Sequence, residues 1–277
     1  MAKTKRLIKE CLSSVDIVLE LLDARIPKSS KNPDIDTLAG EKPKLIIMTK
    51  ASLANPNATK KWVEYYNSLG KSVVVVDSAL GTGLDSLSSA VKDILSEKLQ
   101  RYSDKGMTGK QIKAMIVGIP NVGKSSLINK LAGGKKAKVE NRPGVTLNKQ
   151  WVPTDIGLTL LDTPGVLWPK FEDENVGFNL AATGAIKDAI LDTEEIAMLL
   201  SYKLLRISQE SFCERYKLSP EEALELDSYD LFRLIGKKRG FLISGGDVNH
   251  ERTAQMLLEE FRSAKIGRIT LELPEEN

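Results

Sequence analysis

The chain has 277 residues, of which 42% are hydrophobic and 28% are charged, and its formal net charge is +3. This length predicts one or two domains with substantial apolar cores. No run of about eighteen apolar residues and no signal peptide is visible, which argues against membrane-spanning and secreted classes and predicts a soluble, cytoplasmic protein. Cys11 and Cys213 lack metal-ligand spacing, so we expect buried structural thiols.

The predicted elements alternate between strand and helix up to about residue 165, a pattern typical of an α/β fold with a parallel sheet flanked by helices. Apolar runs predict strands that occupy, in chain order, residues 44–48, 73–76, 111–117 and 158–161. The polar stretch 101–109 would join two halves of this sheet. From about Val176 the strand pattern disappears. Helical spacing then relates Ile196, Leu199, Leu200, Lys203 and Leu204 in one segment, and Ala254, Leu257, Leu258 and Phe261 in another.

The stretch 118–125 reads Gly-Ile-Pro-Asn-Val-Gly-Lys-Ser and is a complete phosphate-binding loop between a predicted strand and a predicted helix. Its glycines let successive N–H groups point at phosphates. Lys124 would reach the β- and γ-phosphates, Ser125 would offer its hydroxyl to Mg²⁺, and the helix N-terminus adds positive charge. The alternative is a turn without a ligand. The predicted nucleotide contacts here are Asn121, Val122, Gly123, Lys124, Ser125 and Ser126.

Two motifs follow the phosphate loop. Residues 141–146 are polar and turn-prone and end in Thr146, a candidate to close on Mg²⁺ and the γ-phosphate; the alternative is an ordinary strand residue. The strand at 158–161 leads into Asp162-Thr-Pro-Gly165, where the Asp162 carboxylate suits holding Mg²⁺ through the water ligands of the ion, and the Gly165 N–H would sense the γ-phosphate. We predict metal-site roles for Ser125, Thr146 and Asp162, and catalytic roles for Lys124, Thr146, Gly165 and Asn121.

The base-reading stretch is degenerate. The strand at 44–48 ends in Thr49-Lys50-Ala51-Ser52, where nucleotide-binding proteins of this class carry Asn-Lys-x-Asp. Ser52 would make one ordinary hydrogen bond where a carboxylate makes two charge-assisted ones, a deficit of about 1–3 kcal/mol. We therefore predict a weakened preference for guanine; the alternative is a strand that ends in a polar turn. After the strand at 73–76, Ser78 and Ala79 would place a backbone N–H near guanine O6.

In this chain the base-reading stretches precede the phosphate loop, whereas in an ordinary small GTPase they follow it. The motifs therefore occur in permuted order. In this order the chain resembles the YlqF/RbgA type of ribosome-biogenesis GTPase. Residues 23–27 (Asp-Ala-Arg-Ile-Pro) match a motif of that group, and residues 235–240 and 244–246 match its C-terminal region. The resemblance covers essentially the whole chain. It implies a circularly permuted P-loop GTPase domain over residues 1–170 and an all-α domain over residues 171–277 that binds ribosomal RNA.

Two features depart from that family. One is Ser52. The other concerns an aromatic-Pro-Gly-His stretch that the family usually carries before Met-Ala-Lys, with a histidine implicated in hydrolysis; this sequence begins at Met1-Ala2-Lys3. Two readings stay open, a truncated sequence or hydrolysis without that group. The single histidine, His250, lies near a predicted helix start, where we expect a surface or RNA-facing residue.

Val166 stands where Ras-like enzymes place the glutamine that orients water. We therefore expect slow intrinsic hydrolysis that depends on positioning and electrostatics, with the ribosomal particle as activator. The resemblance suggests a further role for Asn121. In several similar GTPases an Asn at this position helps to hold a potassium ion, which supplies charge in place of an arginine finger. The alternative is a turn-forming Asn.

Basic residues concentrate near the C-terminus, with eight basic and four acidic residues between Arg233 and Arg268. Such a stretch suits contact with the phosphate backbone of structured RNA, although a charge run is often a solvated face. The predicted RNA-binding residues are Lys237, Lys238, Arg239, Arg252, Arg262, Lys265 and Arg268.

Three functions remain open from the sequence. The first is a monomeric GTPase, with GTP or GDP, Mg²⁺ and K⁺ as cofactors, that assembles the large (50S) ribosomal subunit and binds its rRNA. The second is a nucleotide-regulated RNA-binding protein with vestigial hydrolysis. The third is a P-loop NTPase that uses ATP or acts on another target, which the Ser78-Ala79 pair and the permuted order disfavour.

Overall fold

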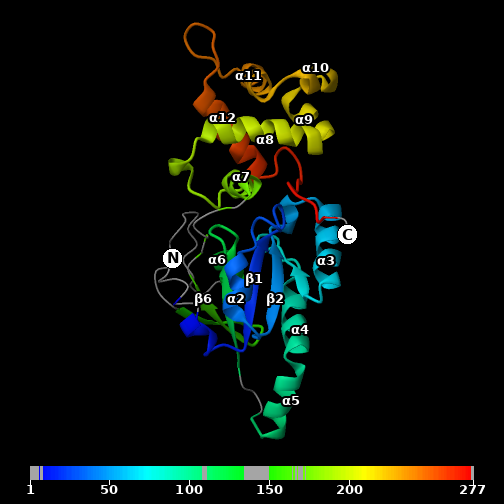
Figure 1. The fold of residues 1–277 in the computed structure, drawn as a ribbon, viewed down its shortest axis with the longest axis vertical. Coiled ribbons are helices and arrows are strands. Elements are labelled where there is room, and N and C mark those ends of the chain that lie inside the picture. The colour runs from blue at the N-terminus through cyan, green and yellow to red at the C-terminus, as the bar shows by residue number, and fades with distance from the viewer. Residues whose placement is uncertain are drawn as a thin grey trace.

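A computed structural model describes residue 6, residues 9–107, 111–133, 150–163 and 173–275, and residues 165, 167 and 171. The molecule is elongated (Figure 1). A sheet flanked by helices forms its middle, a group of helices lies over one end of the sheet, and a helical arm projects beyond the other end.

The sheet has the order β3-β2-β1-β4-β6-β5. Its strands are β1 (Ile17–Asp23), β2 (Lys44–Thr49), β3 (Val73–Val75), β4 (Ile112–Gly118), β5 (Gln150–Pro153) and β6 (Leu158–Asp162). All neighbouring pairs are parallel except β5 and β6. The mostly parallel sheet confirms the α/β prediction, and each of the four predicted strands is present. Every residue of β1 is buried, because helices cover both faces of a parallel sheet.

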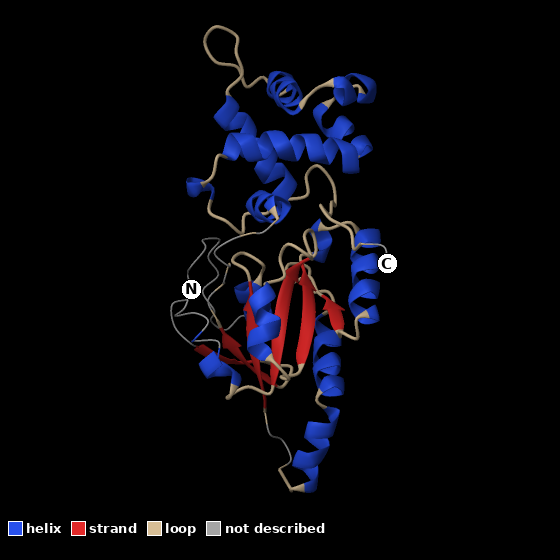
Figure 2. Cartoon of the chain, in the orientation of Figure 1, coloured by secondary structure: helices blue, strands red, loops and turns tan. Residues whose placement is uncertain are grey.

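Alternate residues of β1 enter different apolar clusters, as the two-residue period of a strand requires. Ile17, Leu19 and Leu21 pack with α4 (Leu84–Ile94) and α6 (Lys124–Leu131). On the other face, Val18 packs near α2 (Pro33–Ala39), and Leu22 packs near α3 (Pro56–Ser68). Figure 2 shows the helices on both sides of the strands.

The helical arm is α5 (Ser96–Asp104), and it takes up part of the predicted linker. Residues 101–104 continue the helix, so the connection between the two halves of the sheet begins later than the polar composition suggested. A separate short 3₁₀ turn, η1 (Ala51–Leu53), contains Ser52.

The helices beyond the sheet follow in chain order. They are α7 (Glu174–Ala182), η2 (Asp188–Ile190), α8 (Thr193–Ile207), α9 (Gln209–Tyr216), α10 (Pro220–Glu225), α11 (Ser228–Lys238) and α12 (His250–Arg262). Both predicted amphipathic segments are helices, α8 and α12. In α8 the predicted apolar face is correct for Leu200 and Leu204, which are buried, whereas Leu199 is 45% exposed. Among the residues described, no helix combines the length and apolar character that crossing a membrane would require.

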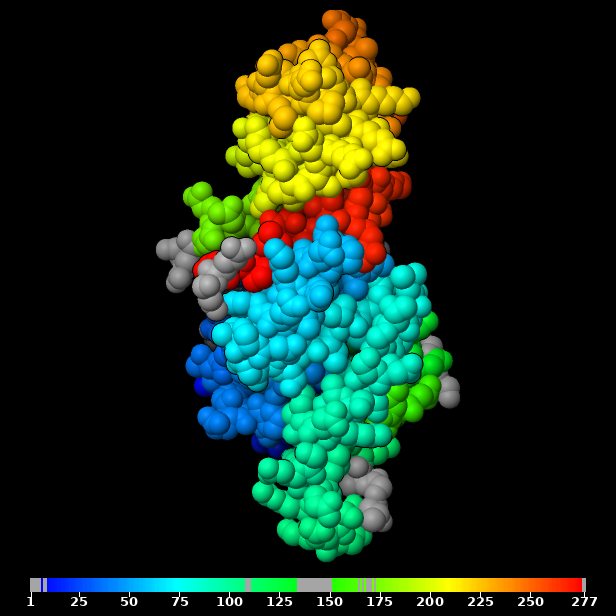
Figure 3. All heavy atoms as spheres, turned by 90° about the vertical axis from the view of Figure 1, so that its right-hand side faces the viewer, coloured from blue at the N-terminus to red at the C-terminus, as the bar shows by residue number. Residues whose placement is uncertain are grey.

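The chain returns to the sheet after α12. Residues 268–272 lie between the helices and the strand layer, seen as the red segment at the junction in Figure 3. There Leu271 N donates to Arg25 O and Ile269 N donates to Leu53 O. One continuous apolar cluster extends from the sheet into α8 and α12, so the two regions pack against each other. Both cysteines are free and buried, as predicted.

Candidate nucleotide-binding site

The parallel strands bring the sequence motifs to one edge of the sheet. β1 ends at Asp23, β2 at Thr49, β4 at Gly118 and β6 at Asp162, and all four strands run in the same direction. Ligands of open α/β sheets bind at the carboxyl ends of the strands. Motifs separated by more than 100 residues in sequence therefore lie together at one site.

The phosphate loop folds as its residue pattern predicted. Gly123 has a φ of 105° and Asn121 a φ of 57°, and α6 begins at Lys124. The Lys124 side chain crosses the loop, and its Nζ donates to Gly118 O at 3.0 Å and Ile119 O at 2.8 Å. Burial lowers the pKa of Lys124 to about 8, while Asp162 opposes this shift. The ammonium thus lies where phosphate oxygens could replace the loop carbonyls as its partners.

The Asp162–Gly165 segment closes on the phosphate loop. Asp162 is 5% exposed and pairs with Ile116 of β4, and Thr163 Oγ1 donates to Ile116 O at 2.6 Å. A Cβ added to Gly165 would lie 2.8 Å from Pro120 Cα and 3.0 Å from Lys124 Nζ. No side chain fits in this gap, so a glycine is required for the segment to approach the loop closely.

The charge and hydroxyl groups here suit a magnesium–nucleotide complex. Ser125, in the first turn of α6, is half-buried, and the Asp162 carboxylate is near enough to Lys124 to affect its pKa. Within the described part of the chain, no group of three or more His, Cys, Asp or Glu side chains could hold a metal. Mg²⁺ usually takes phosphate and water ligands alongside one or two protein groups, so Ser125 and Asp162 fit this ion. The predicted Thr146, and Val166, lie outside the described residues.

Thr49 connects the base-reading stretch to the phosphate loop. Its Oγ1 donates to Val122 O at 2.6 Å and also lies 3.0 Å from Leu22 O. The side chain is buried. The threonine that replaces the usual asparagine therefore still holds the two loops against each other through its hydroxyl.

Lys50 and Arg25 share a buried carboxylate that the sequence singled out only as part of a motif. Asp23 Oδ2 accepts from Lys50 Nζ at 2.9 Å and from Arg25 Nη2 at 2.7 Å, and Asp23 Oδ1 accepts from Arg25 Nε at 2.9 Å. Burial alone would raise the pKa of Asp23, but Arg25 and Lys50 hold it well below its usual range. The Asp23 carboxylate thus holds Lys50, the lysine of the base-reading stretch.

Ser52 has a partner that sequence reasoning missed. Its backbone N donates to Asp77 Oδ2 at 2.9 Å and its Oγ donates to the same oxygen at 2.5 Å. Asp77 Oδ1 accepts from Ala79 N at 2.9 Å and Leu80 N at 3.0 Å. The predicted contact of the Ala79 N–H with guanine O6 would therefore require this amide to exchange partners. An acidic residue directly before Ser78 was the available signal in the sequence.

Hydrogen bonds join the site to the helices. Asn121 Nδ2 donates to Gly184 O, just after α7, at 2.6 Å. The Arg25 guanidinium lies 5.6 Å from the centre of the Phe261 ring in α12. Arg268 Nη2 donates to Ala51 O at 2.9 Å, in the turn that contains Ser52. Both the phosphate loop and the base-reading turn therefore contact the helical region directly.

The predicted RNA-binding residues divide into two groups. Lys237, Lys238, Arg252 and Lys265 are exposed, and Arg268 is exposed as well although its guanidinium has partners within the fold. The three arginines other than Arg252 are engaged within the fold. Arg239 pairs with Glu260, and Arg262 pairs with Asp188 and donates to Ala181 O and Ala182 O. Arg268 donates to Ala54 O and Ala51 O. RNA binding by any of the seven stays a prediction.

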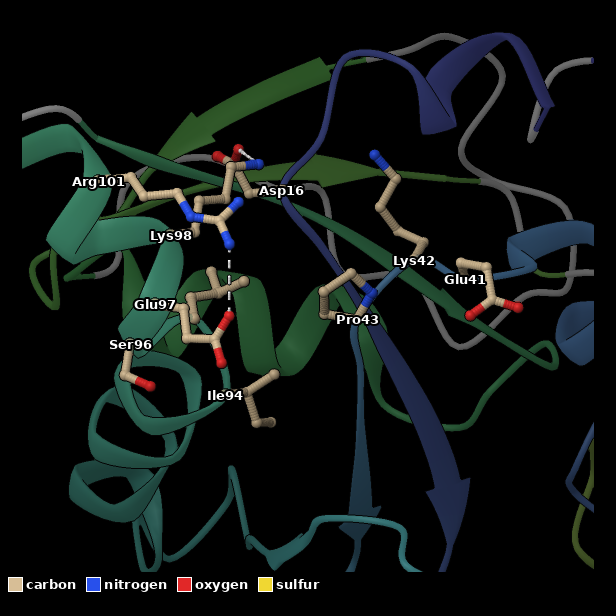
Figure 4. Close-up of a pocket in the computed structure, with 10 residues that line it drawn as sticks. Asp16, Glu41, Lys42, Pro43, Ile94, Ser96, Glu97, Lys98 and Arg101 are labelled. Atoms are coloured by element: carbon tan, nitrogen blue, oxygen red, sulfur yellow. Dashed lines mark ion pairs between the residues drawn. The ribbon is translucent and has the colours of Figure 1, made fainter.

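A hollow of about 590 Å³ lies at the opposite, amino-terminal edge of the sheet (Figure 4). Asp16 and Pro43, which precede β1 and β2, line it together with α5. Four of its charged side chains form ion pairs, with Lys98 Nζ 2.6 Å from Asp16 Oδ1 and Arg101 Nη2 3.6 Å from Glu97 Oε2. None of the sequence motifs reaches it.

Comparison with known proteins shows the family to which the chain belongs. Residues 113–216 match the family described as 50S ribosome-binding GTPase. The chain is 46% identical over 279 residues to ribosome biogenesis GTPase A of Priestia megaterium, with 100% of this chain and 95% of the relative covered. It is 30% identical over 274 residues to the protein of that name from Thermotoga maritima, with 99% and 92% covered.

Two solved structures resemble the whole chain. A GDP-bound YlqF has a TM-score of 0.72 at 27% identity and covers 98% of this chain and 100% of its own. A GNP-bound YlqF from T. maritima has a TM-score of 0.68 at 28% identity, with 99% and 100% covered. In the present structure, the base-reading strands β2 and β3 precede β4 in sequence. In the sheet, β4 lies beside β1, on the side away from β2 and β3.

Proposed function

Because the chain belongs to the ribosome biogenesis GTPase A family of circularly permuted P-loop GTPases, we propose that it hydrolyses GTP while it acts on the large (50S) ribosomal subunit. The family description of residues 113–216 names this subunit. In this proposal the protein acts as a cytoplasmic monomer, and its GTPase domain occupies residues 1–170.

The observation that carries the proposal is the direct hydrogen bonding between the loops of the candidate nucleotide site and segments that follow helices α7 and α12. Asn121 in the phosphate loop contacts Gly184, and Arg268 contacts Ala51 in the base-reading turn. A nucleotide that reorders either loop would change these contacts, and such local changes commonly reposition a neighbouring element. This arrangement supports nucleotide-dependent movement of the helices.

The helical residues 171–277 would bind ribosomal RNA. Lys237 and Lys238, in the last turn of α11, are exposed, as are Arg252 and Lys265. Exposed ammonium and guanidinium groups bind phosphate backbones largely without sequence preference, which suits structured RNA. Arg239, Arg262 and Arg268 would support RNA binding indirectly by stabilising the helical region, because their side chains already have protein partners.

Intrinsic hydrolysis would be slow, and the ribosomal particle and K⁺ would stimulate it. Lys124 and the phosphate-loop amides supply charge stabilisation, and Mg²⁺ held by Ser125 and Asp162 would supply more. Asn121 is anchored through Nδ2 to Gly184 O, and its Oδ1 is the atom suited to bind a cation. Thr146 would complete the site from outside the described residues.

The decisive experiment measures GTP hydrolysis by the full chain in K⁺ and in Na⁺, with and without purified large subunits. We expect strong stimulation by the subunits and turnover several-fold lower in Na⁺. Bound nucleotide without stimulation would favour the alternative, a nucleotide-regulated RNA-binding protein. Equal rates in the two salts would remove the role of potassium.

A pair of charge reversals tests the RNA surface. Lys237→Glu with Lys238→Glu should weaken binding to large subunits and lower its salt dependence, with GDP affinity unchanged. The matched control is Lys60→Glu with Lys61→Glu, since these adjacent lysines are also exposed but lie on α3 beside the sheet. Equal effects of the two pairs would contradict a specific RNA surface on α11.

A further inference from the structure

The base-reading turn lacks its usual carboxylate, but a carboxylate lies directly behind it. Asp77 follows β3 and is 2% exposed, and its Oδ2 accepts both the N–H and the hydroxyl of Ser52. Its other oxygen accepts the N–H groups of Ala79 and Leu80. Asp77 thus joins the two loops from which guanine would be recognised.

In the hydrogen bond between Ser52 and Asp77, the hydroxyl is the donor and the carboxylate is the acceptor. Burial alone would raise the pKa of Asp77, but hydrogen bonds from Ser52, Leu80 and Ala79 hold it below its usual range. The carboxylate is therefore ionised at neutral pH and can only accept hydrogen bonds. The Ser52 hydroxyl must donate its single hydrogen to Asp77, which leaves Ser52 Oγ with acceptor lone pairs alone for any other partner.

The loop that carries Asp77 is held rigidly. Asp77 N donates to Thr82 O at 3.0 Å, and Asp77 O accepts from Gly81 N at 2.7 Å. Gly83 has a φ of 76°, and a Cβ there would lie 2.1 Å from Val75 O. The backbone therefore keeps the carboxylate in place beneath Ser52.

We propose that Asp77 is a positioning residue for guanine recognition, because it turns the Ser52 hydroxyl into an acceptor that faces the base. Guanine presents the donors N1–H and N2–H₂ on its recognition edge, whereas adenine presents the acceptor N1 at the same ring position and has its donor, N6–H₂, where guanine has O6. A free hydroxyl could serve either base by rotating, but one that is committed to Asp77 selects guanine. The negative charge absent from position 52 is supplied instead by Asp77, in the loop after β3. This inference rests on the proposed binding of GTP.

The test is the ratio of the Kd for ADP to the Kd for GDP, measured by calorimetry on the full chain. In Asp77→Asn, the amide can donate to Ser52 Oγ and release the serine hydrogen toward the base. We expect the Kd for GDP to rise about 10-fold, the upper end of the range for loss of one ordinary hydrogen bond between uncharged groups. The Kd for ADP should change less than about 2-fold, because adenine does not use the acceptor that Ser52 loses.

Three further variants separate positioning from support of the loop. Ser52→Ala should lower the ratio as Asp77→Asn does, and the two changes together should lower it no further, because the residues act as a unit. Ser52→Asp combined with Asp77→Asn places the carboxylate in the base-reading turn and should restore the ratio. Asp85→Asn is the matched control, because it removes an exposed charge from the next helix, α4.

The outcomes are distinct. Equal losses for GDP and ADP in Asp77→Asn would mean that Asp77 only supports the loop, and unchanged Kd values for both nucleotides would mean that it does not affect the base; either result overturns the inference. If the unmodified chain binds neither GDP nor ADP, the proposed function is overturned, and this inference with it.

Discussion

Replacing Asp23 by asparagine should destabilise the protein strongly, because it leaves a buried cation without its counter-charge. Asp23 and Arg25 have side chains that are each 2% exposed, and the guanidinium donates to both carboxylate oxygens. Removing one partner of a buried pair costs about 3–5 kcal/mol. The Lys50 side chain is 24% exposed and can turn toward water, so it adds little.

The expected loss lies at the lower end of that range. Asparagine keeps an acceptor for the Arg25 backbone N–H, which donates to Asp23 Oδ1 at 3.0 Å. We therefore expect the free energy of unfolding to fall by about 3 kcal/mol, a large part of the 5–15 kcal/mol typical of a domain. Urea unfolding at pH 7, followed by tryptophan fluorescence and circular dichroism, measures it.

Asp36→Asn is the control that distinguishes burial from the number of ion pairs. Asp36 contacts Lys31, Lys44 and Lys71, but its side chain is 37% exposed, so its replacement should cost only about 0–1 kcal/mol. Since the pKa of Asp23 is depressed, its contribution persists above about pH 4 and is lost only as the pH falls further. A loss for Asp23→Asn below about 1 kcal/mol, or no larger than the control, would refute the reasoning.

Two predictions concern pH. Burial raises the pKa of Glu20 to about 7, and its Oε1 has no hydrogen-bond partner in the described structure, so the folded state is favoured at low pH and loses stability as the pH rises through 7. Glu20→Gln should therefore gain about 1–3 kcal/mol at pH 8.5 and much less at pH 5, measured from urea midpoints; equal gains at both would contradict this. Because burial lowers the pKa of Lys124 to about 8, GDP affinity should fall roughly 10-fold per pH unit above that value in calorimetry. Lys124→Arg should flatten this dependence, and a flat profile for the unmodified chain would exclude the proposed role of the lysine charge.

Local sequence patterns predicted the elements that form the site. The strand at 111–117 and the loop at 118–125 were recognisable because a buried parallel strand is continuously apolar and a phosphate loop needs glycines at fixed spacing. Gly165 follows the same logic, since its lack of a side chain permits the close approach to Pro120. The permuted order of the motifs was also legible in the sequence, because it depends only on which motif comes first.

Contacts between distant residues could not be read in this way. The base-reading stretch indicated that position 52 lacks a charged group, yet Asp77 supplies one from the loop after β3. Arg262 and Arg268 were grouped with the basic surface, but both donate to backbone carbonyls far away in the chain. Charge patterning shows that a residue is basic without showing what faces its side chain.

By itself, the sequence determined the α/β sheet, the phosphate loop and the helices that follow, because each depends on residue spacing within about ten positions. Only the tertiary structure decided that Asp23 holds Lys50, that Asp77 orients Ser52, and that the C-terminal segment returns to the base-reading turn. Those pairings depend on strand order and on how the helices pack over the sheet edge. Residues far apart in sequence therefore become neighbours, and no local sequence pattern indicates the contact.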